Sequence, residues 1–171
     1  LDANRAKAQV AKKCNLEISE IKKMTIWGNH SPTMYPDLDN AEIKGESASG
    51  WINDQSWIES DFLRIVQQRG KAIIDARGAS SATSAANAAI DTVKATLSET
   101  PEDDWFSAAV MSDGSYNVPD GLIFGFPLKT DASGKVSIVP DLPISEYAQE
   151  KIDLTTQELS LIHISEPTRR Y

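Results

Sequence analysis

Cysteine and histidine are both scarce in this chain of 171 residues. Cysteine occurs once, at Cys14, so an internal disulfide or a cysteine-based metal cluster cannot form, and a reducing compartment such as the cytoplasm is the natural expectation. Histidine occurs only at His30 and His163. The acidic pairs of the chain are typical of solvated surface, with nothing nearby to complete a metal site. We therefore expect no metal.

Basic residues and long apolar runs are also few. Lys and Arg number 17 against 25 Asp and Glu, which gives a net charge of -8. Nucleic acids and anionic membranes require a basic face, so neither is expected as a partner, although a small anionic substrate is not excluded. No apolar run reaches the length of a membrane span. The chain starts at Leu1, as though cut from a longer protein, so the absence of a targeting sequence carries no information.

The apolar pattern predicts an α+β domain in which long helices pack on antiparallel strands. Helices are expected over residues 3–14, from residue 56 to about 75 with a kink at Gly70, from Ser81 to Leu97, and over 145–158. Strands are expected at 24–27, 41–43, 105–112, 122–128 and 136–139, with a turn-rich stretch at 45–53. The buried stripe predicted for the second long helix is Ala85, Ala89, Val93 and Leu97.

One short stretch, Trp27-Gly28-Asn29-His30-Ser31, presents a histidine just after an apolar run. We expect residues 28–36 to form a loop. Upstream, Leu1-Asp2-Ala3-Asn4-Arg5 supplies a carboxylate and an arginine at the start of a helix. A histidine, a carboxylate and an arginine can together move a proton and grip an anionic substrate. The residues alone do not decide whether the two stretches meet.

The end of the chain has a different character. Residues 159–169 read LSLIHISEPTR, which resembles a widely used transposase sequencing adapter translated in frame. We therefore expect residues 1–158 to form the domain and residues 159–171 to be a tail that is not native, which removes His163 from the candidate ligands and bases.

Several stretches together resemble one enzyme family. The chain reads LDANRAKAQVA and TIWGNHSPTMYPD near its start, VQQRGKAIIDARGASSATSAANAAID in its middle, and SDGSYNVPDGLIFGFPL and EKIDLTTQEL toward its end. In this order they are similar to the second half of the cytosolic, NAD-dependent malate dehydrogenases of the lactate/malate dehydrogenase superfamily. The resemblance covers residues 1–158 and includes the relative spacing of Asp2, Arg5 and His30.

The resemblance implies a C-terminal substrate domain without the N-terminal Rossmann domain that holds most of the NAD. Accordingly, the chain contains no GxGxxG fingerprint. The implied reaction is the reversible oxidation of (S)-malate to oxaloacetate with hydride transfer to NAD. The implied setting is a cytoplasmic homodimer to which the helices over residues 57–74 and 81–97 contribute. The fragment alone is expected to be inactive and poorly soluble, because the face toward the missing domain would be apolar.

The resemblance also assigns roles to single residues. His30 is implied as the acid and base next to the nicotinamide, for which imidazole suits because its reference pKa of about 6.5 lies near working pH. Asp2 orients His30, Arg5 binds a substrate carboxylate with parallel hydrogen bonds, and Ser81 lines the substrate pocket. Without the resemblance, His30 would be interpreted as an ordinary loop histidine and Asp2 as a helix cap. Arg5 would be interpreted as a surface partner of Asp2, and Ser80 and Ser81 as helix caps.

Two alternatives remain open at this point. A related 2-hydroxy acid dehydrogenase of the lactate or NADP-dependent malate type would share these residues, because substrate and cofactor choice are set largely in the absent half. A catalytically silent interaction protein derived from a dehydrogenase is the other alternative. The presence of Asp2, Arg5 and His30 together argues against it.

Overall fold

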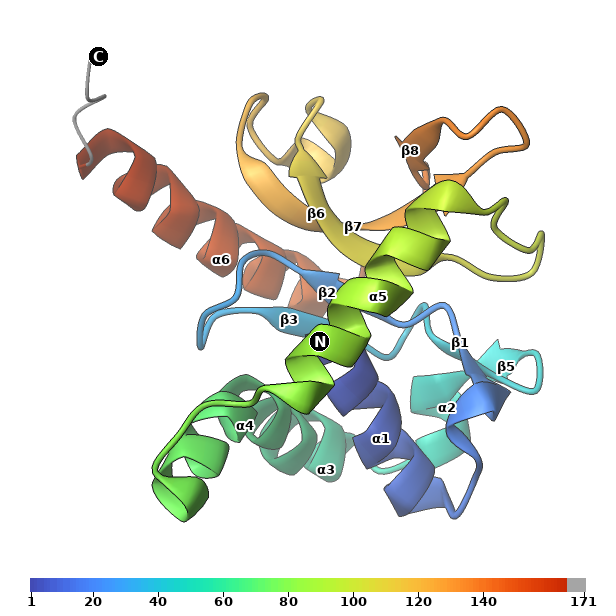
Figure 1. Cartoon of the computed structure of the whole chain (residues 1–171), viewed down its shortest axis with the longest axis vertical. Helices are drawn as coiled ribbons and strands as arrows, with labels where there is room; N and C mark the ends of the chain where they lie inside the picture. Colours follow the sequence, from blue (N-terminus) through green and yellow to red (C-terminus); the bar gives the residue numbers. More distant parts are fainter. Residues whose placement is uncertain (166–171) are drawn as a thin grey trace.

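The computed structural model describes residues 1–165, which form an α+β domain (Figure 1). Helix α1 (Asp2–Cys14) is followed by a 3-10 turn (Ile18–Glu20) and by short strands that form hairpins. The strands are β1 (Ile21–Lys22), β2 (Thr25–Trp27), β3 (Tyr35–Asp37), β4 (Glu42–Ile43) and β5 (Glu46–Ser47). The antiparallel pairs are β1 with β4, β4 with β5, and β2 with β3.

The middle of the chain is helical and the last third returns to strands. The helices are α2 (Ala48–Ile52), α3 (Gln55–Trp57), a π-helical turn (Ile58–Phe62), α4 (Leu63–Arg77) and α5 (Thr83–Leu97). Strands β6 (Phe106–Met111), β7 (Ile123–Thr130) and β8 (Val136–Ile138) form an antiparallel sheet in that order, with a 3-10 turn (Ser115–Asn117) between β6 and β7. Helix α6 (Glu146–Ser165) follows.

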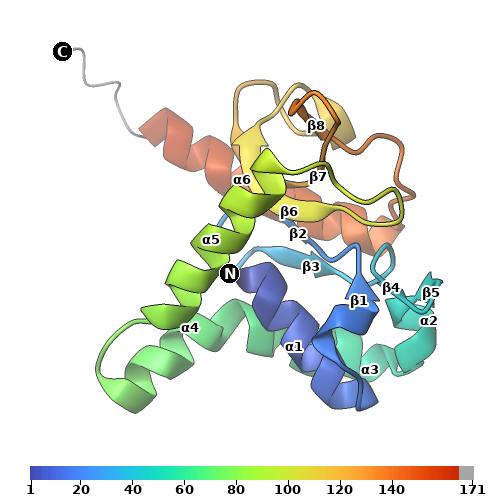
Figure 2. The ribbon, with the colours of Figure 1, turned by 45° about the vertical axis from the view of Figure 1, so that its right-hand side comes forward.

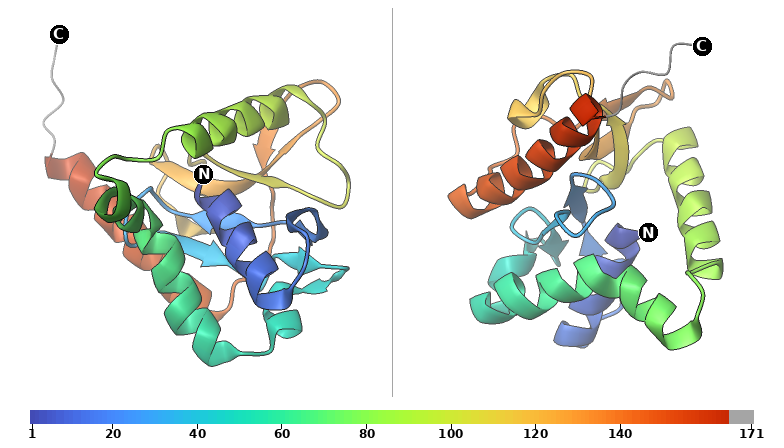
Figure 3. Two further views of the ribbon diagram at one scale, coloured as in Figure 1. Left: turned by 60° about the horizontal axis from the view of Figure 1, so that its bottom comes forward. Right: turned by 90° about the vertical axis from the view of Figure 1, so that its left-hand side faces the viewer.

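The helices lie around the strands on different sides. Helices α1, α3 and α4 lie together below the β2–β3 hairpin, and α5 leads from α4 to the sheet of β6, β7 and β8 (Figure 2). Helices α5 and α6 lie on opposite sides of the strands (Figure 3). The order of helices and antiparallel strands confirms the fold class that the apolar pattern predicts.

The β2–β3 hairpin separates two apolar cores. Successive strand residues point to opposite faces, so Ile26 joins a cluster with Val10, Phe62 and Val66, whereas Trp27 joins a cluster with Phe126. The indole N–H of Trp27 donates to the carboxylate of Asp37 at 3.0 Å. Burial raises the pKa of Asp37. His30 lies three residues beyond Trp27, on a hairpin packed on both faces.

Several local predictions are wrong in detail. The predicted loop over 28–36 contains the start of β3, because Trp27 pairs with Tyr35 and Ile26 with Pro36. The turn-rich stretch contains β5 and α2. Gly70 lies inside α4, which is unbroken from Leu63 to Arg77, and the irregular turn lies upstream at Ile58–Phe62.

The expected buried stripe of α5 is wrong as well. Val93 and Leu97 are 55% and 78% exposed, whereas Ala88 is buried. The helix contacts β6 and β7, and Ala88 is the buried residue on it. Helix α5 also begins at Thr83 and has Ala82 as its N-cap residue, so neither Ser80 nor Ser81 caps it. Ile74 of α4 and Leu154 of α6 are also about half exposed, at 48% and 49%.

Strand β1 was not predicted, whereas α1 and the start of α6 lie where the pattern places them. Ala6 and Val10 of α1 are buried, and Cys14 packs against the same core. Ser145 caps α6, since its hydroxyl accepts from the backbone N–H of Ala148 at 3.2 Å. Helix α6 continues through Ser165, past the domain limit predicted at residue 158, and residues 166–171 lie outside the described part of the chain. The origin of the tail stays a prediction.

Two kinds of feature are absent from the described residues. No helix in this part is long and apolar enough to cross a membrane. No group of three or more metal-ligating side chains was found there either.

Candidate active site

The first turn of α1 presents Asp2 and Arg5 on one face. Residues three apart on a helix are neighbours, and an Nη1 of Arg5 donates to Oδ1 of Asp2 at 2.9 Å. Both side chains are largely buried, with 12% and 11% of their surfaces exposed. The positive end of the helix dipole also favours the Asp2 carboxylate at this position. The start of α1 therefore holds an ion pair whose geometry is set by the helix.

His30 completes this pair from the loop between β2 and β3. Its Nδ1 lies 2.6 Å from the second carboxylate oxygen of Asp2, Oδ2. The imidazole is 69% exposed, whereas its carboxylate partner is buried. When Nδ1 carries a proton and donates a hydrogen bond to Asp2, Nε2 has a free lone pair that can accept a proton. The two predicted stretches do meet in space.

Ser81 also lies in this group. An Nη2 of Arg5 donates to the Ser81 hydroxyl at 3.4 Å, although the two residues are 76 positions apart in the chain. Among the described residues, hydrogen bonds to Asp2 and Ser81 thus engage two of the five N–H donors of the guanidinium. The structure therefore brings together all four residues that the sequence predicts for the site: Asp2, Arg5, His30 and Ser81.

Two glycines let the β2–β3 hairpin approach the large sheet at the start of the His30 loop. Gly28 and Gly125 of β7 form a backbone bridge, with Gly125 N donating to Gly28 O at 2.7 Å. A Cβ on Gly125 would lie 2.6 Å from the carbonyl oxygen of Ile26. Only glycine allows such an approach, so the His30 loop is tied to the sheet.

A cavity of about 150 Å³ opens beside His30. Its walls include Asp2 and His30, and small residues such as Gly28, Ala108 and Gly125 form much of the rest. A larger groove of about 850 Å³ runs between α1, α4 and α5, and Arg5 lines it. Asp2, with its neighbour Arg5, thus lies between a small pocket at His30 and a wide groove along the helices.

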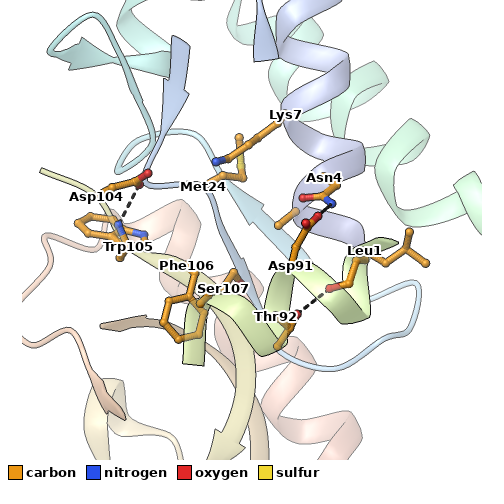
Figure 4. A pocket seen from close by; sticks show the side chains of 13 residues that line it. Leu1, Asn4, Lys7, Met24, Asp91, Thr92, Asp104, Trp105, Phe106 and Ser107 are labelled. Atoms are coloured by element: carbon orange, nitrogen blue, oxygen red, sulfur yellow. Dashed lines mark hydrogen bonds between the residues drawn. The ribbon is translucent and has the colours of Figure 1, made fainter. Parts of the chain in front are cut away.

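A further cavity of about 190 Å³ lies between α1, α5 and β6 (Figure 4). Asn4 of α1 and Asp91 of α5 point toward one another across it, and the Asn4 amide donates to the Asp91 carboxylate at 3.2 Å. Ser107 lines both this cavity and the one beside His30. Its hydroxyl accepts from the Ile26 backbone N–H at 2.9 Å, so Ser107 is engaged in holding β2.

Comparison with known proteins decides the family. The model of the lactate/malate dehydrogenase alpha/beta C-terminal domain matches residues 1–164. The chain belongs to this family. It matches the malate dehydrogenase of Naegleria fowleri at 41% identity and a TM-score of 0.86, covering 94% of this chain and 48% of that one.

Lactate dehydrogenases are also among the similar structures. The lactate dehydrogenase of Trichomonas vaginalis, solved with NADH and oxamate, is 29% identical with a TM-score of 0.85, over 96% of this chain and 53% of that one. The malate dehydrogenase of Plasmodium falciparum, at 22% identity and a TM-score of 0.79, shares the fold over 94% of this chain and 50% of its own. The chain thus spans about half the length of these relatives and matches the model of their C-terminal domain.

The site also includes residues that sequence reasoning missed. Gly125 supports the His30 loop from β7, and Thr155 and Glu158 of α6 hydrogen-bond to that loop. Thr155 and Glu158 follow the buried Ile152 at helical spacing, so all three lie on one face of α6. Two polar residues on a buried face are the one local indication in the sequence of a polar contact there. Nothing in a single sequence tells which loop they reach.

Proposed function

We propose that this chain is the substrate-binding half of an NAD-dependent malate dehydrogenase, with His30 as the acid and base. The observation that carries the proposal is the hydrogen bond between His30 Nδ1 and Asp2, with Arg5 on the other carboxylate oxygen. The 41% identity to a malate dehydrogenase, against 29% to a lactate dehydrogenase, supports the choice of malate. The cytoplasm remains our expectation for its location.

Proton transfer follows from the charges of the three residues. Asp2 and Arg5 carry opposite charges, and a base must be neutral to take a proton. His30 Nε2 takes the hydroxyl proton of malate, and Asp2 stabilises the imidazolium that forms while keeping the ring in one orientation. In the reverse direction the same nitrogen returns the proton to the carbonyl oxygen of oxaloacetate.

Arg5 and Ser81 bind the substrate in this proposal. The guanidinium is held by Asp2 and Ser81, so its plane is already oriented when a substrate carboxylate arrives, and fewer rotamers are lost on binding. A carboxylate held by two parallel N–H donors places the hydroxyl-bearing carbon near His30.

The small residues beside His30 fit a flat ring. Gly28, Ala108 and Gly125 line the adjacent cavity and leave room that larger side chains would fill. NAD, when bound, takes up the hydride that leaves the substrate carbon. This chain contributes His30 and the small-residue wall to the cofactor side of the site, and the rest of the cofactor site belongs to the missing domain.

The test uses the full-length protein that contains this domain. Replacing His30→Asn removes the group that takes the proton, and general acid–base catalysis is worth about 10²–10⁴-fold, so turnover of oxaloacetate with NADH should fall by at least that factor. NADH should still bind, as followed by its fluorescence, because most of the cofactor site belongs to the missing domain. A variant that keeps its turnover would refute the assignment of His30.

A lactate-type activity is the second candidate. The Trichomonas vaginalis lactate dehydrogenase superposes almost as well as the Naegleria fowleri malate dehydrogenase, with TM-scores of 0.85 and 0.86. Assaying the full-length enzyme with oxaloacetate and pyruvate, each with NADH and NADPH, separates the malate, lactate and NADP-dependent alternatives. No turnover with any combination would favour the silent interaction protein.

We also propose that the full-length enzyme is a homodimer that uses α5. Ile90, Val93 and Leu97 share one stripe of this helix and are 55%, 55% and 78% exposed. Val93→Glu places a charge in that stripe, so sedimentation of the variant should show monomers where the parent shows dimers. A variant that remains dimeric while losing NADH binding would instead place the missing domain on this stripe.

A further inference from the structure

Helix α6 holds the His30 loop through Thr155. This side chain is fully buried. Its hydroxyl oxygen accepts from the backbone N–H of Asn29 at 3.3 Å and lies 3.5 Å from the side-chain oxygen of the same residue, to which it donates. The residue immediately before His30 is therefore fixed to α6 by both its backbone and its side chain.

One turn further along α6, Glu158 holds the other side of the loop. The Ser31 hydroxyl donates to Oε2 of Glu158 at 2.7 Å, and the Thr33 hydroxyl donates to the same oxygen. These two hydrogen bonds hold the pKa of Glu158 below its ordinary value, so the carboxylate stays charged and keeps accepting. The residue immediately after His30 is thus fixed to α6 as well.

Gly28 shows how closely α6 approaches. A Cβ at this position would lie 2.2 Å from the Thr155 hydroxyl oxygen and 2.4 Å from its methyl carbon. Gly28 also has a φ of +95°, which side-chain-bearing residues rarely adopt. The Thr155 side chain of α6 is therefore packed directly against the backbone of the loop.

The imidazole depends on this support. Among the described residues, the hydrogen bond to Asp2 is the one side-chain hydrogen bond of His30. Asp2 is carried by α1, whereas the backbone around His30 is held by α6 and β7. The distance between Nδ1 and Oδ2 is therefore the distance between two separately anchored elements, and shifting the loop changes it directly.

We propose that Thr155 and Glu158 are positioning residues that hold the His30 backbone where its ring meets Asp2. The inference rests on the proposed role of His30. Misplacing a catalytic group by about 1 Å costs on the order of 100-fold in rate, so losing an anchor on one side of the loop should be visible in turnover. Arg5 and Ser81 do not touch α6 through these contacts, so substrate binding should change little.

The experiment compares four variants of the full-length enzyme. Glu158→Ala removes the acceptor for both hydroxyls and should lower kcat by about 10- to 100-fold with KM nearly unchanged. Glu158→Gln keeps an oxygen that can accept and should recover most of that loss. Thr155→Val keeps the shape and removes the hydroxyl, and should lower kcat in the same sense. Glu150→Ala, an exposed position on the same helix, is the control and should match the parent.

A second measurement does not depend on activity. In protein labelled with ¹⁵N-histidine, the ring signals of His30, assigned with His30→Asn, report the Nδ1 hydrogen bond to Asp2. Glu158→Ala and Thr155→Val should weaken that signal, and Glu150→Ala should not. If the anchor variants lower only the melting temperature and leave both kcat and the ring signals as in the parent, the positioning role is wrong. If His30→Asn itself retains turnover, the proposed function fails, and the ring signals still decide the positioning.

Discussion

Gly28 offers a sharp test of how the His30 loop is held. The substitution Gly28→Ala adds one methyl group at a position with a φ of +95° and places it 2.2 Å from the Thr155 hydroxyl. Two separate costs result. One is the backbone strain of a side-chain-bearing residue at positive φ, and the other is the steric conflict with α6.

The free-energy cost of each effect can be estimated from its typical magnitude in proteins. A residue held in a sparsely populated backbone region costs about 1–3 kcal/mol. Overfilling a packed site costs about 1–3 kcal/mol more, and rotating Thr155 does not remove the conflict because its Cβ would also lie 2.8 Å from the added methyl group. The sum of about 2–6 kcal/mol is a large part of the 5–15 kcal/mol by which a domain is typically stable.

Gly121 is the matched control. It has a φ of +85°, and a Cβ there would meet nothing within 4 Å. Gly121→Ala should therefore show the strain alone, about 1–3 kcal/mol. In urea unfolding of the chain at low concentration, followed by circular dichroism, Gly28→Ala should unfold at a clearly lower midpoint than Gly121→Ala. Equal midpoints would refute the packing of α6 on the loop, and Thr155→Ala should recover part of the loss in the double variant.

Two further predictions concern buried carboxylates. Asp2→Asn leaves an amide that cannot accept from both Arg5 and His30, so kcat of the full-length enzyme should fall by about 10²–10⁴-fold with NADH binding intact, and a smaller loss would exclude the orienting role. Burial raises the pKa of Asp37, so the folded state keeps a proton that the unfolded state has lost. The unfolding free energy should therefore decline as pH rises from the ordinary carboxyl value through the folded value, relative to Asp37→Asn. Parallel urea midpoints for the two proteins across that range would contradict a raised pKa.

Some features of this protein can be predicted from the sequence alone, because they depend on residues that are close together in the chain. The helical spacing of Ala6 and Val10 places both on the buried face of α1, and apolar runs separated by turn residues predict β6, β7 and β8, since these signals act within a few residues. The stretches around Asp2, Arg5 and His30 resemble one family closely enough to name the site residues before any contact is known.

Other features were decided by the tertiary structure, because they depend on what packs from a distance. Val93 on α5 is exposed because no other element of the described chain packs on that side of the helix. The helical spacing of apolar residues does not indicate whether such a neighbour exists. The contact between Arg5 and Ser81 joins residues 76 positions apart. The anchoring of the His30 loop by Thr155 and Glu158 requires α6 to lie beside a hairpin formed more than a hundred residues earlier. Periodicity in the sequence determines which face of a helix is polar, and only the packing of the whole domain determines what that face touches.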